Sequence, residues 1–191
     1  MYLTSLTLII SLMLASAISF RMSALQSGAS IGGAPRKQIE LERAQSAELA
    51  KKLKDGWGEE GQSRVRQQIY WDFALIPYYV ALFASFCLLM TKFYGAMLAQ
   101  WPTLTAWITG SGVWLALACI VAGTLDVFEN IFMLLVLHPS DREWWQPSAH
   151  FCSSLKFGIL CSVGVCLALE LVIAFACAAW TRSESVHPSA T

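Results

Sequence analysis

The stretch from Trp114 to Leu137, WLALACIVAGTLDVFENIFMLLVL, restricts the possible folds of this chain more than any other stretch. It is long and apolar enough to cross a bilayer, which takes about 20 residues as a helix. It also carries Asp126, Glu129 and Asn130 near its middle. An ionisable group inside a membrane costs roughly 2.5–3.5 kcal/mol on insertion scales. The stretch therefore predicts a membrane helix whose polar side chains are buried against other helices.

The composition agrees with a membrane protein. The mean hydropathy is +0.53, with 56% hydrophobic and only 14% charged residues, whereas a soluble domain needs more polar surface. The formal net charge is zero, which argues against a nucleic-acid partner. None of the six cysteines forms a CxxC pair, so we interpret them as packing residues. No metal site or cofactor is predicted.

Four apolar runs predict an all-α integral membrane four-helix bundle, with spans at residues 1–20, 71–94, 114–137 and 155–180. The first run is interpreted as an N-terminal membrane anchor. A signal peptide is the alternative, because Ala15-Ser16-Ala17 resembles a small-residue cleavage site. The anchor is favoured, because signal peptides begin with basic residues and no Lys or Arg comes before Arg21.

Polar segments flank and connect these spans. Residues 21–35 form a Gly/Ser/Ala-rich flexible linker, and residues 36–70 a juxtamembrane helical hairpin broken at Gly56-Trp57-Gly58. Trp57 is expected at headgroup level, although a solvated connecting helix explains this segment equally well. Residues 71–180 form a three-span bundle with loops at 100–112 and 138–153, and 181–191 a polar tail. Pro77 is expected to kink the second span.

The basic residues predict the orientation in the membrane. Nine of the thirteen Lys and Arg residues lie between Arg21 and Arg66, and Arg142 and Lys156 lie at the junction of the third and fourth spans. With four spans these regions share one side, which the positive-inside rule assigns to the cytoplasm. Both termini then face outward.

Helical spacing predicts how the intramembrane polar groups meet. Asp126, Glu129 and Asn130 share one helix face, and Asp126 is expected near the bilayer midplane, roughly 18 Å from either end of its span. Lys156 is expected to pair with Glu129 or Asp72, and Glu170 to approach Asp126. The predicted cluster comprises Asp72, Asp126, Glu129, Asn130, Lys156 and Glu170. The small residues Ser154, Gly158, Ser162 and Cys166 predict a ridge on the fourth span for close packing of the third.

Two functions fit such a cluster. It can be a hydrogen-bonded lock that fixes helix register in a non-enzymatic accessory or scaffold protein, whose partners are the lipid bilayer and possibly another membrane protein. It can instead be a proton or ion relay, or the polar floor of a pocket for an amphiphile such as a lipid or quinone. An enzyme is less favoured, because no nucleophile constellation accompanies the carboxylates. His138 and His150 are interpreted as interface residues.

Three motifs together resemble a family of small bacterial four-span membrane proteins with no established activity. They are ELERAQSAELAKKLKDGWGEEG followed by YWDFALIPYY, LDVFEN within an apolar helix, and SSLKFGIL at the start of the last span. The matching positions are Trp57, Asp72, Tyr79, Asp126, Glu129, Asn130 and Lys156. The resemblance covers most of the chain from about Glu40 to Trp180 and does not include Glu170. It implies a four-span layout in the bacterial inner membrane and no particular mechanism.

Overall fold

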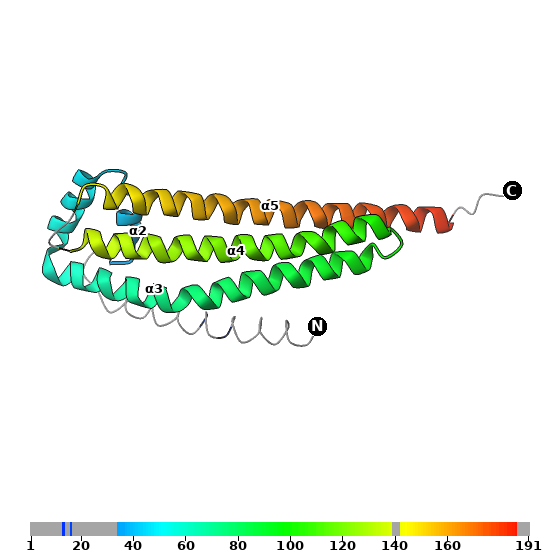
Figure 1. Cartoon of the computed structure of the whole chain (residues 1–191), viewed down its shortest axis with the longest axis horizontal. Helices are drawn as coiled ribbons and strands as arrows, with labels where there is room; N and C mark the ends of the chain where they lie inside the picture. Colours follow the sequence, from blue (N-terminus) through cyan, green and yellow to red (C-terminus); the bar gives the residue numbers. More distant parts are fainter. Residues whose placement is uncertain (1–12, 14–15, 17–33, 139–141, 187–191) are drawn as a thin grey trace.

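The computed structural model describes Met13, Ser16 and residues 34–138 and 142–186, with side chains between 39 and 180 (Figure 1). The regular elements of the two described ranges are helices: α2 (Ala34–Arg43), α3 (Ala47–Met97), α4 (Pro102–Val136) and α5 (Trp145–Val186). The predicted anchor at residues 1–20, apart from Met13 and Ser16, and most of the linker lie outside the described residues. Within the described ranges the all-helical prediction is confirmed.

Three of these helices are long and apolar enough to cross a membrane: α3, α4 and α5. They lie side by side with α4 between the other two (Figure 1). Of the most apolar part of each helix, 44% is buried in α4 but only 17% in α3 and in α5. Most apolar residues of α3 and α5 therefore keep part of their surface exposed, and removing that surface from water requires an apolar environment such as a membrane.

The third predicted span is too short, because α4 begins at Pro102 and not near Trp114. The loop predicted at residues 100–112 is therefore wrong beyond Trp101. Proline suits the first turn of a helix, since it has no N–H to leave unsatisfied there. Thr105 then donates a hydrogen bond to the Leu98 carbonyl at 2.6 Å, which fixes the tight connection from α3. Gly112 does not interrupt the helix, because α3 packs closely against it.

The last span also begins earlier than predicted. α5 begins at Trp145, within the loop predicted at residues 138–153, and remains helical to Val186, within the predicted polar tail. Its buried side chains include Ala149, Lys156, Val163 and Glu170, which recur every seven residues. A seven-residue repeat keeps one face of a helix against its neighbours in a left-handed bundle.

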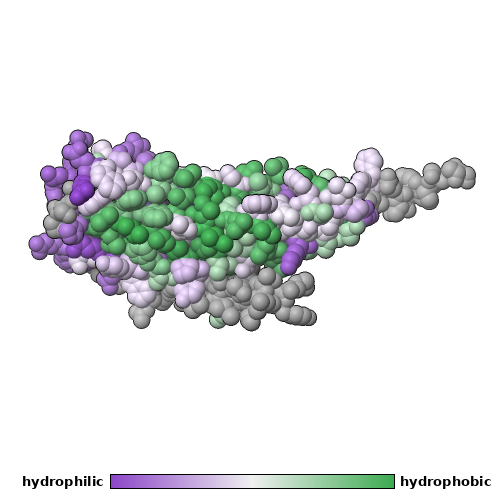
Figure 2. All heavy atoms as spheres, viewed as in Figure 1, coloured by the Kyte–Doolittle hydropathy of each residue, from purple (hydrophilic) through white to green (hydrophobic). Residues whose placement is uncertain are grey.

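One end of the bundle is closed by α2 and the first turns of α3, where hydrophilic residues gather (Figures 1 and 2). The prediction that the hairpin breaks near Gly56-Trp57-Gly58 is confirmed, because Gly58 has a φ of 62° within α3. A second break, which the sequence did not predict, separates α2 from α3 at residues 44–46. There the Ser46 side chain caps α3 by accepting a hydrogen bond from the Leu49 N–H at 3.2 Å. Helical backbone angles continue through Pro77.

The hairpin is packed against the bundle and is not a solvated connector. Leu41, Ala44 and Ala50 are fully buried in one apolar core with residues of α4 and α5, and Trp57 packs against that core. Gln146 of α5 donates to the Leu41 and Ala44 carbonyls at 2.6 and 2.7 Å. These bonds add a partner to the Leu41 carbonyl, which also accepts from the Ala44 N–H at 3.1 Å, and satisfy the Ala44 carbonyl just past the end of α2.

Two cations of α3 bind the end of α4 in the same way. Lys54 donates to the Val136 carbonyl at 3.1 Å, and Arg66 donates to the Leu137 carbonyl at 2.7 Å. Positive charge is favourable at this end of a helix, where the last carbonyls carry partial negative charge. The basic residues of the hairpin therefore have a definite role in the fold, which is to hold the first part of α3 against the end of α4.

Candidate functional site

A polar cluster lies inside the bundle, and Asp126 of α4 connects all three long helices. Lys156 of α5 donates to Asp126 Oδ1 at 2.5 Å, while the Tyr79 hydroxyl of α3 donates to Asp126 Oδ2. The two oxygens of one carboxylate thus bind two different helices. Asp126 is 6% exposed, so little water competes for these bonds. This side chain fixes α4 relative to both of its neighbours.

Lys156 bridges two carboxylates of α4. Its Nζ lies 2.5 Å from Asp126 Oδ1 and 2.6 Å from Glu129 Oε2. The predicted contact between Lys156 and Glu129 is therefore confirmed, whereas the alternative pairing with Asp72 is wrong. Asp126 and Glu129 are one helical turn apart, so one ammonium on the facing helix can reach both. Glu129 is 1% exposed, and such a charge requires a partner.

Asp72 of α3 forms a hydrogen bond with Asn130, the third residue of the predicted polar face of α4. Asn130 Nδ2 donates to Asp72 Oδ2 at 2.9 Å. Asn130 is fully buried and Asp72 is half-buried at the edge of the cluster. This bond forms a second link between α3 and α4, one turn from the Tyr79–Asp126 link. Together the two links oppose sliding of α3 along α4.

Glu170 does not join this cluster, so the predicted approach to Asp126 is wrong. Its Oε1 lies 2.5 Å from the Ser111 hydroxyl of α4. Glu170 is 14 residues beyond Lys156 on α5, which is about 21 Å along a helix. Ser111 is 15 residues before Asp126 on α4 and lies at the level of Glu170. The antiparallel helices therefore separate the two carboxyls by several turns.

The predicted packing ridge is also wrong as a contact with α4. Ser154, Gly158, Ser162 and Cys166 are all exposed on α5, and a Cβ atom built on Gly158 would meet no atom within 4 Å. Small residues can face either protein or lipid in a membrane helix, so their spacing alone does not fix the buried face. The buried face of α5 follows the seven-residue repeat that contains Lys156 and Glu170.

The cluster is displaced from the middle of α4. Asp126 is ten residues before Val136, about 15 Å from that end of the helix, but 24 residues after Pro102. The expected midplane position assumed a helix that begins at Trp114. The twelve additional residues at the start of α4 move the cluster toward the end that carries α2. The polar groups thus lie nearer the side predicted to be cytoplasmic.

Glu42 of α2 is a neighbour of the cluster that the sequence did not identify. It is half-buried, and its backbone carbonyl lies 3.3 Å from His150 Nδ1 of α5. Burial and the nearby Glu129 carboxyl raise the pKa of Glu42 from 4.5 to about 7, while Lys156 partly opposes the shift. A polar residue on a short helix gives no sequence signal of this kind, because the effect depends on where α2 docks.

This pKa predicts that docking of α2 depends on pH. A carboxyl whose pKa is raised in the folded state stabilises that state at pH values below the ordinary pKa of the group. The stabilisation is lost as the pH rises from about 4.5 to about 7. The loss should amount to at most about 3 kcal/mol. Amide hydrogen exchange at the end of α2 should therefore be slower at pH 5 than at pH 8, after correction for the intrinsic rate.

Glu42→Gln should remove this pH dependence, and His150→Gln should retain it. The other ionisable groups that face Glu42 are Asp72 of α3, Asp126 and Glu129 of α4 and Lys156 and His150 of α5. Identical pH profiles for wild type and Glu42→Gln would assign the dependence to one of these groups and contradict the prediction.

Comparison of the chain with protein-family models, curated proteins and solved structures finds no match. Among the described residues, no three His, Cys, Asp or Glu side chains are grouped so that they could hold a metal ion. The geometry of the cluster and the apolar surface around it are therefore the features that bear on function.

Proposed function

We propose that this chain is a non-enzymatic accessory or scaffold protein of a bacterial inner membrane, with four spans and Asp126, Glu129 and Lys156 as a structural lock. The observation that carries the proposal is the position of Lys156. Its ammonium bridges Asp126 and Glu129 and is held almost fully out of water. A paired and buried group of this kind specifies one arrangement of helices and is poorly placed to bind a substrate.

The same burial argues against a relay. A proton or ion relay needs a hydrated path from the carboxylates to a surface. Asp126, Glu129 and Asn130 are at most 6% exposed. The bonds from Lys156 and Tyr79 occupy both oxygens of Asp126, so an entering ion would have to break them. The lock therefore accounts for the geometry with fewer additional assumptions.

The outer surface of α5 supports an accessory role. Ser154, Gly158 and Ser162 of the predicted ridge are exposed and lie outside the groove with α4, and with no Cβ at Gly158 another spanning helix could approach closely there. Isolation of the protein from its own membrane in a mild detergent should then yield a membrane partner in fixed ratio. Gly158→Leu should reduce that ratio, whereas Gly110→Leu on α4 should not.

The lock itself is tested with Asp126→Asn and Glu129→Gln. Each variant leaves Lys156 with one carboxylate and should lower the free energy of unfolding in detergent by about 1–3 kcal/mol. Glu48→Gln, on the exposed first turn of α3, is the control and should melt as wild type does. Proteoliposomes of wild-type protein should show the proton permeability of empty liposomes. Unchanged melting of both variants, or a proton flux that they abolish, would contradict the lock.

A further inference from the structure

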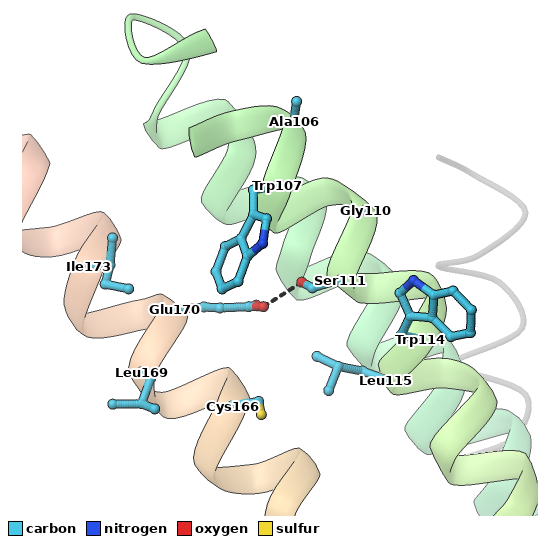
Figure 3. A pocket seen from close by; sticks show the side chains of 10 residues that line it. All are labelled: Ala106, Trp107, Gly110, Ser111, Trp114, Leu115, Cys166, Leu169, Glu170 and Ile173. Carbon is cyan, nitrogen blue, oxygen red and sulfur yellow. Dashed lines mark hydrogen bonds between the residues drawn. The ribbon is translucent and has the colours of Figure 1, made fainter. Parts of the chain in front are cut away.

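A groove between α4 and α5, about 550 Å³ in volume, contains a third buried carboxyl of the described chain that bonds across helices, besides Asp126 and Glu129 (Figure 3). Its walls are mainly apolar, with Trp107, Trp114 and Leu115 from α4 and Leu169 and Ile173 from α5. Trp107 and Trp114 are 65% and 74% exposed, so the groove opens at the surface of the bundle. Its volume is that of a site for a small organic molecule.

The polar part of this groove is the Glu170 carboxyl together with the Ser111 hydroxyl that bonds to it. Glu170 extends from α5 toward Ser111, with Trp107 on one side and Leu115 on the other (Figure 3). Glu170 is 4% exposed. Its Oε2 is buried and finds no hydrogen-bond partner among the described residues. A buried oxygen of this kind is costly unless a donor reaches it.

Charge distinguishes this carboxyl from those of the lock. Asp126 and Glu129 share the ammonium of Lys156, whereas no described Lys, Arg or His forms an ion pair with Glu170. The Trp107 ring beside the carboxyl adds a surface that attracts cations. The groove therefore combines a carboxyl, an aromatic face and apolar walls. A ligand that complements these features carries a cation with N–H donors.

We propose that the groove binds a lipophilic amine, whose ammonium group donates to Glu170 Oε2 and whose hydrocarbon part lies along the apolar walls. A primary ammonium has three N–H donors and a positive charge. An alcohol of the same length has one donor and leaves the charge of the carboxylate unpaired. Amines should therefore bind in preference to alcohols.

The test uses radiolabelled dodecylamine and the full chain in phosphatidylcholine nanodiscs, with empty nanodiscs subtracted. Binding should saturate near one amine per protein. Unlabelled dodecanol should compete at least about tenfold more weakly than unlabelled dodecylamine, because it lacks the charge-assisted bond. Glu170→Gln should weaken amine binding by about tenfold or more for the same reason.

Two glycines provide a matched pair of further variants. A Cβ added at either Gly110 or Gly158 meets no atom within 4 Å, so the first atom of a side chain fits at both positions and both leucine variants should fold. Gly110 lines the groove and Gly158 does not. Gly110→Leu should therefore abolish amine binding, and Gly158→Leu should retain it.

Three results would overturn the proposal: no saturable binding, equal competition by dodecanol, or unchanged affinity in Glu170→Gln. Equal competition would mean that the groove takes neutral lipids. Circular dichroism and gel filtration of each variant establish that it is folded before binding is measured. Because Glu170 lies several turns from Lys156, failure of this test leaves the lock unaffected, and failure of the lock leaves the amine site unaffected.

Discussion

Lys156→Met should destabilise the protein more than any other single substitution in the polar cluster. The change removes the ammonium that bridges Asp126 and Glu129 and leaves two buried carboxylates without their cation. Breaking a buried ion pair by removing one partner typically costs about 3–5 kcal/mol. Thermal unfolding in detergent, followed by circular dichroism, should show a clear fall in the melting temperature.

Two further variants of this chain establish the cause of this loss of stability. Lys92→Met removes an exposed lysine near the other end of α3 and should change stability by no more than about 0.5 kcal/mol. The triple variant Asp126→Asn/Glu129→Gln/Lys156→Met removes all three charges. It should recover most of the lost stability, since an uncharged polar or apolar replacement of a buried ion group is often tolerated. A triple variant as unstable as Lys156→Met would show that packing of the lysine stem, and not charge, causes the loss.

The second large effect should come from Gly112→Ala, at the contact between α3 and α4. A Cβ on Gly112 would lie 2.1 Å from Thr91 Oγ1 and 3.0 Å from Thr91 Cβ. Thr91 is 1% exposed, and its hydroxyl already donates to the Cys87 carbonyl at 3.0 Å. The helices must therefore separate, at a cost of about 1–3 kcal/mol. Chemical or thermal unfolding in detergent measures this loss directly.

Gly110→Ala is the matched control, because it lies two residues away on the same helix with nothing within 4 Å of an added Cβ. Alanine favours a helix over glycine by about 1 kcal/mol, so this variant should be as stable as wild type or slightly more stable. Opposite signs of the change in stability for Gly110→Ala and Gly112→Ala would show that close packing outweighs helix propensity at Gly112. A stabilising Gly112→Ala would contradict the close contact with Thr91.

The sequence predicted features that depend on one helix at a time. Apolar length predicted the three described helices that are apolar enough to cross a membrane, and the spacing of Asp126, Glu129 and Asn130 predicted their common face. The contact of Lys156 with Glu129 followed because few cations occur within the spans and an unpaired buried charge is costly.

Features that depend on the rotation and register of two helices were missed or wrong. The sequence gives Tyr79 no partner, because the bond to Asp126 requires a particular rotation of α3. Glu170 was assigned to the wrong level, because the start of α5 was placed ten residues too late, at residue 155 and not at Trp145. The exposed ridge of α5 was taken as buried, because small residues suit both lipid and protein surroundings. The seven-residue repeat of Ala149, Lys156, Val163 and Glu170 was the signal that could have identified the buried face.

The bonds from Gln146 to α2 also bear on how the protein is made. The Leu41 and Ala44 carbonyls come before Gln146 by 105 and 102 positions. At a synthesis rate of about 5–20 residues per second, roughly 5–20 s pass before Gln146 leaves the ribosome's catalytic centre. During that interval α2, α3 and α4 are all synthesised while α2 lacks its contacts with α5. The two bonds from Gln146 that close this end of the bundle therefore form late in the synthesis of the protein.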